Sequence, residues 1–357
     1  MTRETAGLRA PTSEPGADVV PTGRHAHHRR RIALVVAVGL AVLAALCLTS
    51  LAVGARGLTV GDVWQGLTHP GDASRASIIV WDLRMPRTAL ALVVGCALAV
   101  AGVLMQALTR NPLAEPGLLG VNSGASFAVV TAITLFGATT IDRYVWFALL
   151  GSALTAAFVY VVSVRRTHRG DQARLVLAGA ALSASLGACT GIVTMFHTST
   201  FSSYRFWVIG SVADRGGEVV GRIAPFVAVG LLLALLSGPA LNALVLGDEQ
   251  ATALGARLPL VRVVAFASIT LLCGAATAAA GPIAFVGLVV PHVLRRLVGV
   301  EQRLLLVLSA LVGPALVLAA DIVGRVVARP GELEVGIVTA FVGAPALLAL
   351  LLSRRAA

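Results

Sequence analysis

Long apolar runs separated by short polar stretches fill the chain from Ile32 to its end. A helix of about 20 apolar residues can cross a bilayer, because it satisfies its own backbone hydrogen bonds inside the lipid. The pattern therefore predicts an all-α polytopic membrane protein. We expect ten membrane-spanning helices, at residues 32–54, 88–109, 118–137, 144–164, 175–197, 223–246, 262–280, 282–298, 304–323 and 335–352. An even number of spans places both chain ends on the same side of the membrane.

The first 31 residues differ from the rest, because they show no apolar period and end in a basic cluster. We interpret 1–31 as a disordered basic tail and 32–357 as a ten-helix transmembrane domain. The apolar run that follows the tail is too long for a signal-peptide core and has no convincing cleavage site, so we expect it to be retained. Positive charge favours the cytoplasmic side, which places the tail and the C-terminal Arg354 and Arg355 in the cytoplasm.

Composition agrees with this pattern. Hydrophobic residues make up 57% of the 357 residues, charged residues only 13%, and the mean hydropathy is +0.89. Soluble domains contain about 25% charged residues. Gly and Ala recur through the predicted spans, for example in 92–102 and 177–188. Small residues let helix backbones approach closely in lipid, so the spans are expected to pack tightly.

All 28 basic residues are arginine, and the chain contains no lysine. A Walker A phosphate loop needs a lysine to reach the β and γ phosphates of ATP. The chain therefore cannot be a P-loop ATPase by itself, and any ATP-driven work must come from another polypeptide. The net charge of +11 lies in loops and tails, so it is a sign of membrane topology and not of nucleic-acid binding.

No pattern typical of a catalytic, metal or disulfide site occurs in the sequence. The four cysteines lie inside apolar runs without CxxC spacing, which is typical of small, buried, inert residues: Cys47, Cys96, Cys189 and Cys273. The tail histidines His25, His27 and His28 are expected to be solvated, with metal binding as the less favoured alternative. His292 follows a proline in the eighth predicted span and is expected to have a packing or hydrogen-bonding role, with any further role open.

Residues 109–124, TRNPLAEPGLLGVNSG, interrupt the apolar pattern between the second and third predicted spans. Pro112 and Pro116 disfavour helical backbone in the residues before them, and Gly117 and Gly120 permit unusual dihedral angles. Irregular backbone near membrane depth is tolerated where it is buried in protein or lines a water-filled cavity. The residues alone leave two interpretations open: an ordinary loop, or a gate at the inner mouth of a pathway.

A short helix is predicted between the sixth and seventh spans, in residues 246–259. Asp248 can cap its N-terminus, Glu249 suits the positive end of the helix dipole, and Gly255 suits its end. So short a helix is marginal in water, which suggests that it rests on a partner. The alternative is a bare connecting loop.

Carboxylates are nearly absent at membrane depth. The main candidate is Asp321, with Arg325 one helical turn later on the same face, so the two are expected to neutralise each other near the outer surface. A proton-coupled transporter would be expected to bury more carboxylates.

Several longer motifs occur in a characteristic order: LRMPR at 83–87, the run 101–125, LVLAG at 175–179, and the segments GPIAFVGLVVPHVLRRLVG, DIVGR and ELEVGIVTAFVGAP within 281–345. In these motifs the chain resembles the iron-siderophore and cobalamin permeases of the FecCD family. The likeness extends from the first span to the C-terminus and leaves out the tail.

The resemblance implies a type II permease of an ATP-binding-cassette (ABC) importer, with ten helices per subunit and two halves related by an inverted repeat. Two permease subunits, identical or related, would enclose a pathway within the lipid bilayer of the cytoplasmic membrane. Two ATPase subunits would dock inside and hold the ATP and magnesium, and a substrate-binding protein would dock outside. No cofactor, metal ligand or nucleic acid is implied for this chain.

The resemblance also assigns roles to individual residues. Relatives form an inner gate from the asparagine and leucine of the NPL motif, here Asn111 and Leu113. A second gate element precedes the fifth span, where relatives can carry small hydroxyl residues but this chain has Gln172 and Ala173. A coupling helix that fits a groove on the ATPase corresponds to Gly247, Asp248, Glu249, Ala253, Leu254 and Gly255.

In the cobalamin relative, outer arginines receive carboxylates of the binding protein, and the matching positions here are Arg84, Arg87 and Arg325. The alternative is that Arg325 serves only Asp321 and that the other two reach lipid headgroups.

The sequence thus predicts the permease subunit of an importer for a ferric siderophore. Residues 205–215, RFWVIGSVADR, look closest to permeases for catecholate siderophores. Cobalamin and haem are the near alternatives, and an ATP-independent secondary transporter is a more remote one. A membrane-embedded enzyme would need clustered catalytic residues at one membrane face, and the sequence contains no such cluster.

Overall fold

The computed structural model describes residues 23–54, 59–71, 74–164 and 171–355, and every regular element in this part of the chain is helical. Each of the ten predicted spans coincides with one helix. These helices are α1 (Gly23–Ala52), α4 (Met85–Leu108), α5 (Val121–Phe136), α6 (Ile141–Val164), α7 (Asp171–Phe196), α9 (Gly217–Leu246), α11 (Leu258–Ala280), α12 (Val286–Val298), α13 (Gln302–Val327) and α14 (Val335–Arg355). Within the described residues, seven are long and apolar enough to cross a membrane, whereas α5, α12 and the apolar part of α14 are shorter.

The first helix begins earlier than predicted. It starts at Gly23 and so includes the basic cluster that we assigned to a disordered tail. Arginine is a good helix former, so the basic cluster can continue the helix beyond the apolar run. Residues 1–22, the remainder of the expected tail, lie outside the described residues.

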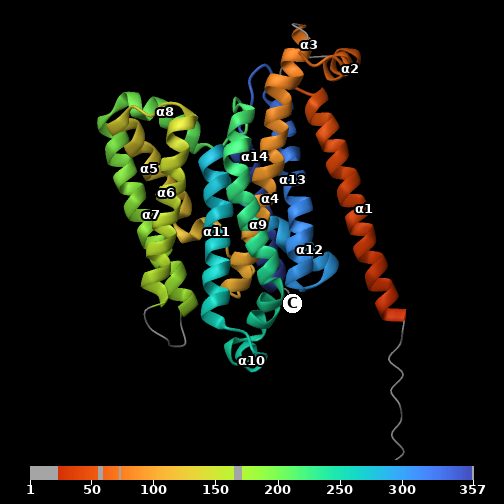
Figure 1. Ribbon diagram of the computed structural model, residues 1–357, viewed down its shortest axis with the longest axis vertical. Coiled ribbons are helices and arrows are strands. Elements are labelled where there is room, and N and C mark those ends of the chain that lie inside the picture. The colour runs from red at the N-terminus through yellow and green to blue at the C-terminus, as the bar shows by residue number, and fades with distance from the viewer. Residues whose placement is uncertain (1–22, 55–58, 72–73, 165–170, 356–357) are drawn as a thin grey trace, which may run out of the picture.

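Helix α4 lies at the centre of the bundle and packs against α13, α9, α11 and α12. Helices α5 to α8 form a group beside it, joined to the rest mainly where α6 packs on α11 (Figure 1). Helix α1 leans along the outside of the bundle, and its main partner is α13. The start of α1, the C-terminus and the short helix α10 (Asp248–Ala253) lie toward the same end of the molecule (Figure 1). The described part of the chain therefore agrees with chain ends on one side.

The opposite end carries the other short elements: α2 (Val60–Thr68), α3 (Arg75–Ile78) and the π-helical turn η1 (Ile79–Arg84), with α8 (Thr198–Val208) over the α5 to α7 group. Helix α2 begins with a capping box between Thr59 and Asp62. The hydrogen bonds from Thr59 lower the pKa of Asp62.

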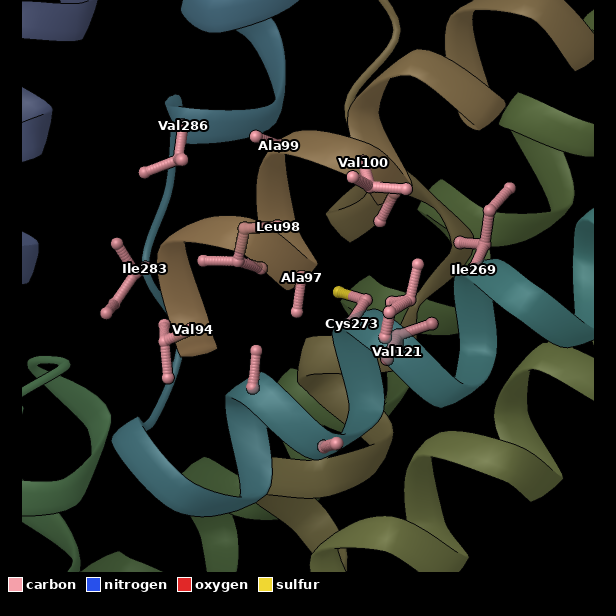
Figure 2. Close-up of a cluster of buried hydrophobic side chains, with 14 of the residues drawn as sticks. Val94, Ala97, Leu98, Ala99, Val100, Val121, Ile269, Cys273, Ile283 and Val286 are labelled. Atoms are coloured by element: carbon pink, nitrogen blue, oxygen red, sulfur yellow. The ribbon is translucent and has the colours of Figure 1, made fainter. Parts of the chain in front are cut away.

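Close helix packing depends on glycine, as the sequence predicts. A Cβ atom at Gly95 would lie 2.7 Å from the Gly313 carbonyl oxygen, so α4 and α13 touch backbone to backbone. Gly102 on α4 meets Gly287 on α12 in the same way. Figure 2 shows part of the core around α4, where Ala97 lies beside Cys273 of α11 and Leu98 lies toward Ile283.

The cysteines only partly follow the expectation. All four are free thiols, and Cys273 is buried, but Cys189 is exposed on α7. The surface of α7 therefore does not face the core of this chain at that position.

Candidate functional site

The chain leaves the helical path between α4 and α5, as the prolines and glycines of this segment predict. We call residues 109–120 the breaker loop. The Leu113 backbone N–H donates to the Asn111 side-chain oxygen over 3.0 Å, which closes a tight turn. A single 3₁₀ turn, η2 (Pro116–Leu119), follows, and Gly120 has a φ of 77°, a conformation that glycine adopts readily.

Partly buried polar contacts fix this loop against a second break in the bundle. The Glu115 carboxylate accepts a 2.6 Å hydrogen bond from the backbone N–H of Phe285, between α11 and α12. Phe285 has a φ of 69°, which is unusual for a residue other than glycine. Just after the loop, the Asn122 side chain accepts a 2.9 Å hydrogen bond from Thr277 on α11. The two irregular segments therefore support each other beside α4.

At its beginning the breaker loop is tied to α9 and α10. The Arg110 guanidinium donates over 2.9 Å to the Leu244 carbonyl oxygen near the end of α9 and also contacts the Asp248 carboxylate. The other oxygen of Asp248 accepts from Arg262 on α11 over 2.7 Å. This three-residue network was not predicted from the sequence.

The predicted gate residues lie on two neighbouring elements. Asn111 is exposed and Leu113 is half-buried on the breaker loop. Gln172 and Ala173 are in the first turn of α7, although their side chains lie outside the described part. The η2 turn of the breaker loop packs against α7. A gate formed by these four residues stays a prediction.

The predicted short helix exists as α10, but one of its assigned roles is wrong. Gly247, with a φ of 123°, precedes the helix as its cap residue, and no side chain caps the N-terminus. Asp248 does not cap, because it is the first residue inside the helix and Gly247 holds the cap position; its carboxylate is bound by two arginines. Gly255 follows the helix with a φ of 83°, which agrees with its predicted role as the stop.

The outward surface of α10 is free of contacts with the rest of the described chain over much of its length. Glu249, Ala253 and Leu254 are exposed, and Leu254 exposes 67% of its surface. A shallow cavity of about 450 Å³ beside α10 is lined by Leu254 and Leu246 among others. A coupling role for this surface stays a prediction.

Three arginines at the opposite end bind the C-terminal carbonyl groups of α1. The last carbonyls of a helix lack partners within it, and positive charge is favourable there. Arg325 donates hydrogen bonds to the carbonyl oxygens of Ser50 and Val53. Arg84 donates to the carbonyl oxygens of Leu51 and Ala52. Arg329 donates to the carbonyl oxygen of Gly54, and the five donor–acceptor distances are 2.6 to 3.2 Å. We call these the α1-capping arginines.

Asp321 lies between two of the predicted docking residues. It is paired with Arg325 and, over 2.7 Å, with Arg87, which also contacts Glu332 over 2.6 Å. The side chain of Arg325 is only 1% exposed. Arg325 therefore serves Asp321, as in the alternative interpretation, and α1 as well. Docking of a partner by the arginines stays a prediction, and it would require Arg325 to leave the bonds that bury it.

A charged cavity of about 600 Å³ opens at this end of the molecule. Its lining includes Arg84, Arg87, Arg215, Asp82, Asp214 and Glu332. His292 lies elsewhere, on α12, beside a cavity of about 410 Å³ between α12 and α14. Among the described residues, no three His, Cys, Asp or Glu side chains gather in a way that could hold a metal ion.

Comparisons with known proteins give a consistent result. The sequence profile of the FecCD transport family matches residues 42–353. The chain is 42% identical over 299 residues to the ferric enterobactin transport system permease protein FepD of Escherichia coli (strain K12), covering 84% of this chain and 89% of that protein. It is 36% identical to the hemin transport system permease protein HmuU of Yersinia pestis, covering 88% and 94%.

A solved structure described as an inward-facing, metal-chelate type ABC transporter also matches. Its TM-score is 0.77 at 30% sequence identity, and the match covers 88% of this chain and 97% of that chain.

Proposed function

The chain belongs to the FecCD transport family, and from this premise we propose that it is the permease subunit of an ABC importer that carries a ferric siderophore across the cytoplasmic membrane. The observation that carries the proposal is the likeness to a ferric enterobactin permease over 84% of the chain. The breaker loop and α10 give the chain a candidate gate and a candidate docking helix at one end of the bundle.

The energy for transport comes from other subunits in this proposal. The chain lacks the lysine of a phosphate loop, so ATP and magnesium belong to the ATPase partners. ATP binding and hydrolysis would shift the permease between inward-open and outward-open states, because only a partner with different affinity for the two states can move the equilibrium. No bond in the substrate is made or broken by this chain, and it needs no cofactor.

The two ends of the bundle take different partners. The end that carries α10 faces the cytoplasm and the ATPase subunits, so the described chain ends are cytoplasmic too. The end with the charged cavity faces the binding protein outside. A second permease, identical or related, completes the pathway, and the gate is formed by Asn111, Leu113, Gln172 and Ala173.

Haem is the second candidate substrate, because the hemin permease HmuU is 36% identical to this chain. Cobalamin, the third candidate, rests on the family resemblance alone.

Uptake of radiolabelled substrates by a strain that lacks this chain tests which substrate is carried. Cells are offered purified ferric siderophores, with catecholates among them, and haem, each labelled in the iron, and separately cobalamin labelled in the cobalt. We expect the deletion to abolish uptake of at least one ferric siderophore and the restored gene to return it. Unchanged uptake of every ferric siderophore would contradict the iron assignment, and selective loss of haem or cobalamin would support that alternative.

A further inference from the structure

One carboxylate joins three elements at the α10 end of the bundle. Asp248, the first residue of α10, offers one oxygen to Arg110 of the breaker loop and the other to Arg262 of α11. The side chains of the three residues are between 29% and 44% exposed, so the network lies at the rim of the bundle.

The contact between Arg110 and Asp248 connects α10 to the breaker loop, which carries the candidate gate residues. The Arg110 Nε donates to the Leu244 carbonyl of α9 while its Nη2 contacts Asp248, so the rigid, planar guanidinium links the end of α9 to the start of α10. The backbone of Arg110 has a φ of 47°, which few residues other than glycine adopt. The next residue is Asn111, so the direction in which the gate loop leaves α4 depends on this conformation.

The contact between Arg262 and Asp248 connects α10 to α11 instead. Helix α11 is largely buried in the core, so Arg262 holds α10 against a rigid part of the bundle. If Arg110 is removed, Asp248 still has a cationic partner and α10 keeps one anchor. If Arg262 is removed, α10 keeps its link to the breaker loop. The two contacts of Asp248 can therefore be removed one at a time by substitution.

We propose that Arg110 is a positioning residue that transmits movement of α10 to the gate at Asn111 and Leu113, whereas Arg262 only anchors α10. The proposal rests on the proposed function, because it assigns the mechanical link of that importer. A displacement of α10 moves Asp248, and the paired Arg110 draws the start of the breaker loop with it.

The test compares Arg110→Gln with the matched control Arg262→Gln, which removes the other partner of the same carboxylate. Each variant is purified with its ATPase subunits and the second permease, placed in liposomes, and supplied with the binding protein on the outer side. Three quantities are measured: ATPase subunits bound, ATP hydrolysed, and ferric siderophore transported per ATP. For Arg110→Gln we expect the ATPase to bind and hydrolyse ATP, with transport per ATP at least about fivefold lower, at the lower limit of typical coupling between sites. Arg262→Gln is expected to leave transport per ATP unchanged.

Arg110→Lys keeps the charge but cannot span Leu244 and Asp248 with one planar group, so an intermediate ratio is expected. This variant also serves as the test should Arg110→Gln fail to fold. A normal ratio in both Arg110 variants, or an equal fall in Arg262→Gln, would overturn the proposal. If the unmodified complex transports no siderophore when ATP is supplied, the proposed function is wrong, and the role proposed for Arg110 is wrong with it.

Discussion

At the scale of residues, arginine carries out several separate tasks in this lysine-free chain. The α1-capping arginines satisfy carbonyl groups that would otherwise face a poorly hydrated surface. Arg325 also forms a buried pair with Asp321, and a buried charge is tolerated only when it is paired and hydrogen-bonded. Capping of α1 and pairing with Asp321 explain why several arginines lie at the end opposite α10, although membrane topology favours positive charge at the other end.

Replacement of Arg325 by glutamine is therefore expected to destabilise the protein by about 3 kcal/mol, near the lower end for breaking a buried ion pair, because Arg87 still neutralises Asp321. The measurement is thermal unfolding of the purified protein in detergent. The matched control is Arg222→Gln, which removes exposed pairs with Asp142 and Glu218 and is expected to cost about 0 to 1 kcal/mol. Equal losses in the two variants would contradict the structural role of Arg325.

At the scale of elements, the positions of the spanning helices follow directly from apolar length, since lipid leaves the chain little choice but helix. The beginning of α1 was less predictable. Residues 24–31 are basic or small and contain no proline or glycine, so nothing in them prevents the helix from starting before the apolar run. The breaker loop was predictable from its two prolines, since their effect is local.

The contacts of the breaker loop could not be predicted in the same way. Glu115 bonds to a backbone group 170 residues later, and Arg110 to a side chain 138 residues later. The predicted cap at Asp248 was wrong, because the helix begins one residue earlier than the prediction requires and the Asp248 carboxylate binds Arg110 and Arg262 instead. Local patterns therefore locate the candidate site, and tertiary contacts determine how its parts are joined.

The exposed side of α10 gives a prediction at this scale. Leu254→Asp places a charge on an apolar side chain that is 67% exposed, so it is expected to prevent the ATPase subunits from binding while the permease still folds. Copurification of the ATPase with the permease measures this. Trp64→Asp, a similar change at a residue 69% exposed on α2, is the matched control and should leave ATPase binding intact. Normal copurification with Leu254→Asp would contradict docking at α10.

At the scale of the whole molecule, the two ends of the bundle have different chemistry. One end presents α10, flanked by the exposed Leu246 and Leu254, beside the Arg110, Asp248 and Arg262 network. The other presents a charged cavity of about 600 Å³ lined in part by η1 and the start of α4. Between them, α4 is held by backbone contacts at glycines, which makes a rigid centre around which the breaker loop is arranged. This polarity suits a conduit that receives substrate at one face and is driven from the other.

The central claim is that transport through this chain is powered by ATP hydrolysed on other subunits. This is tested by uptake of a radiolabelled ferric siderophore into liposomes that contain the chain, the second permease and the ATPase subunits, with the binding protein supplied outside. We expect uptake with ATP on the ATPase side and none with a non-hydrolysable analogue or with an ATPase that lacks its phosphate-loop lysine. Uptake driven by a proton gradient without any nucleotide would contradict it.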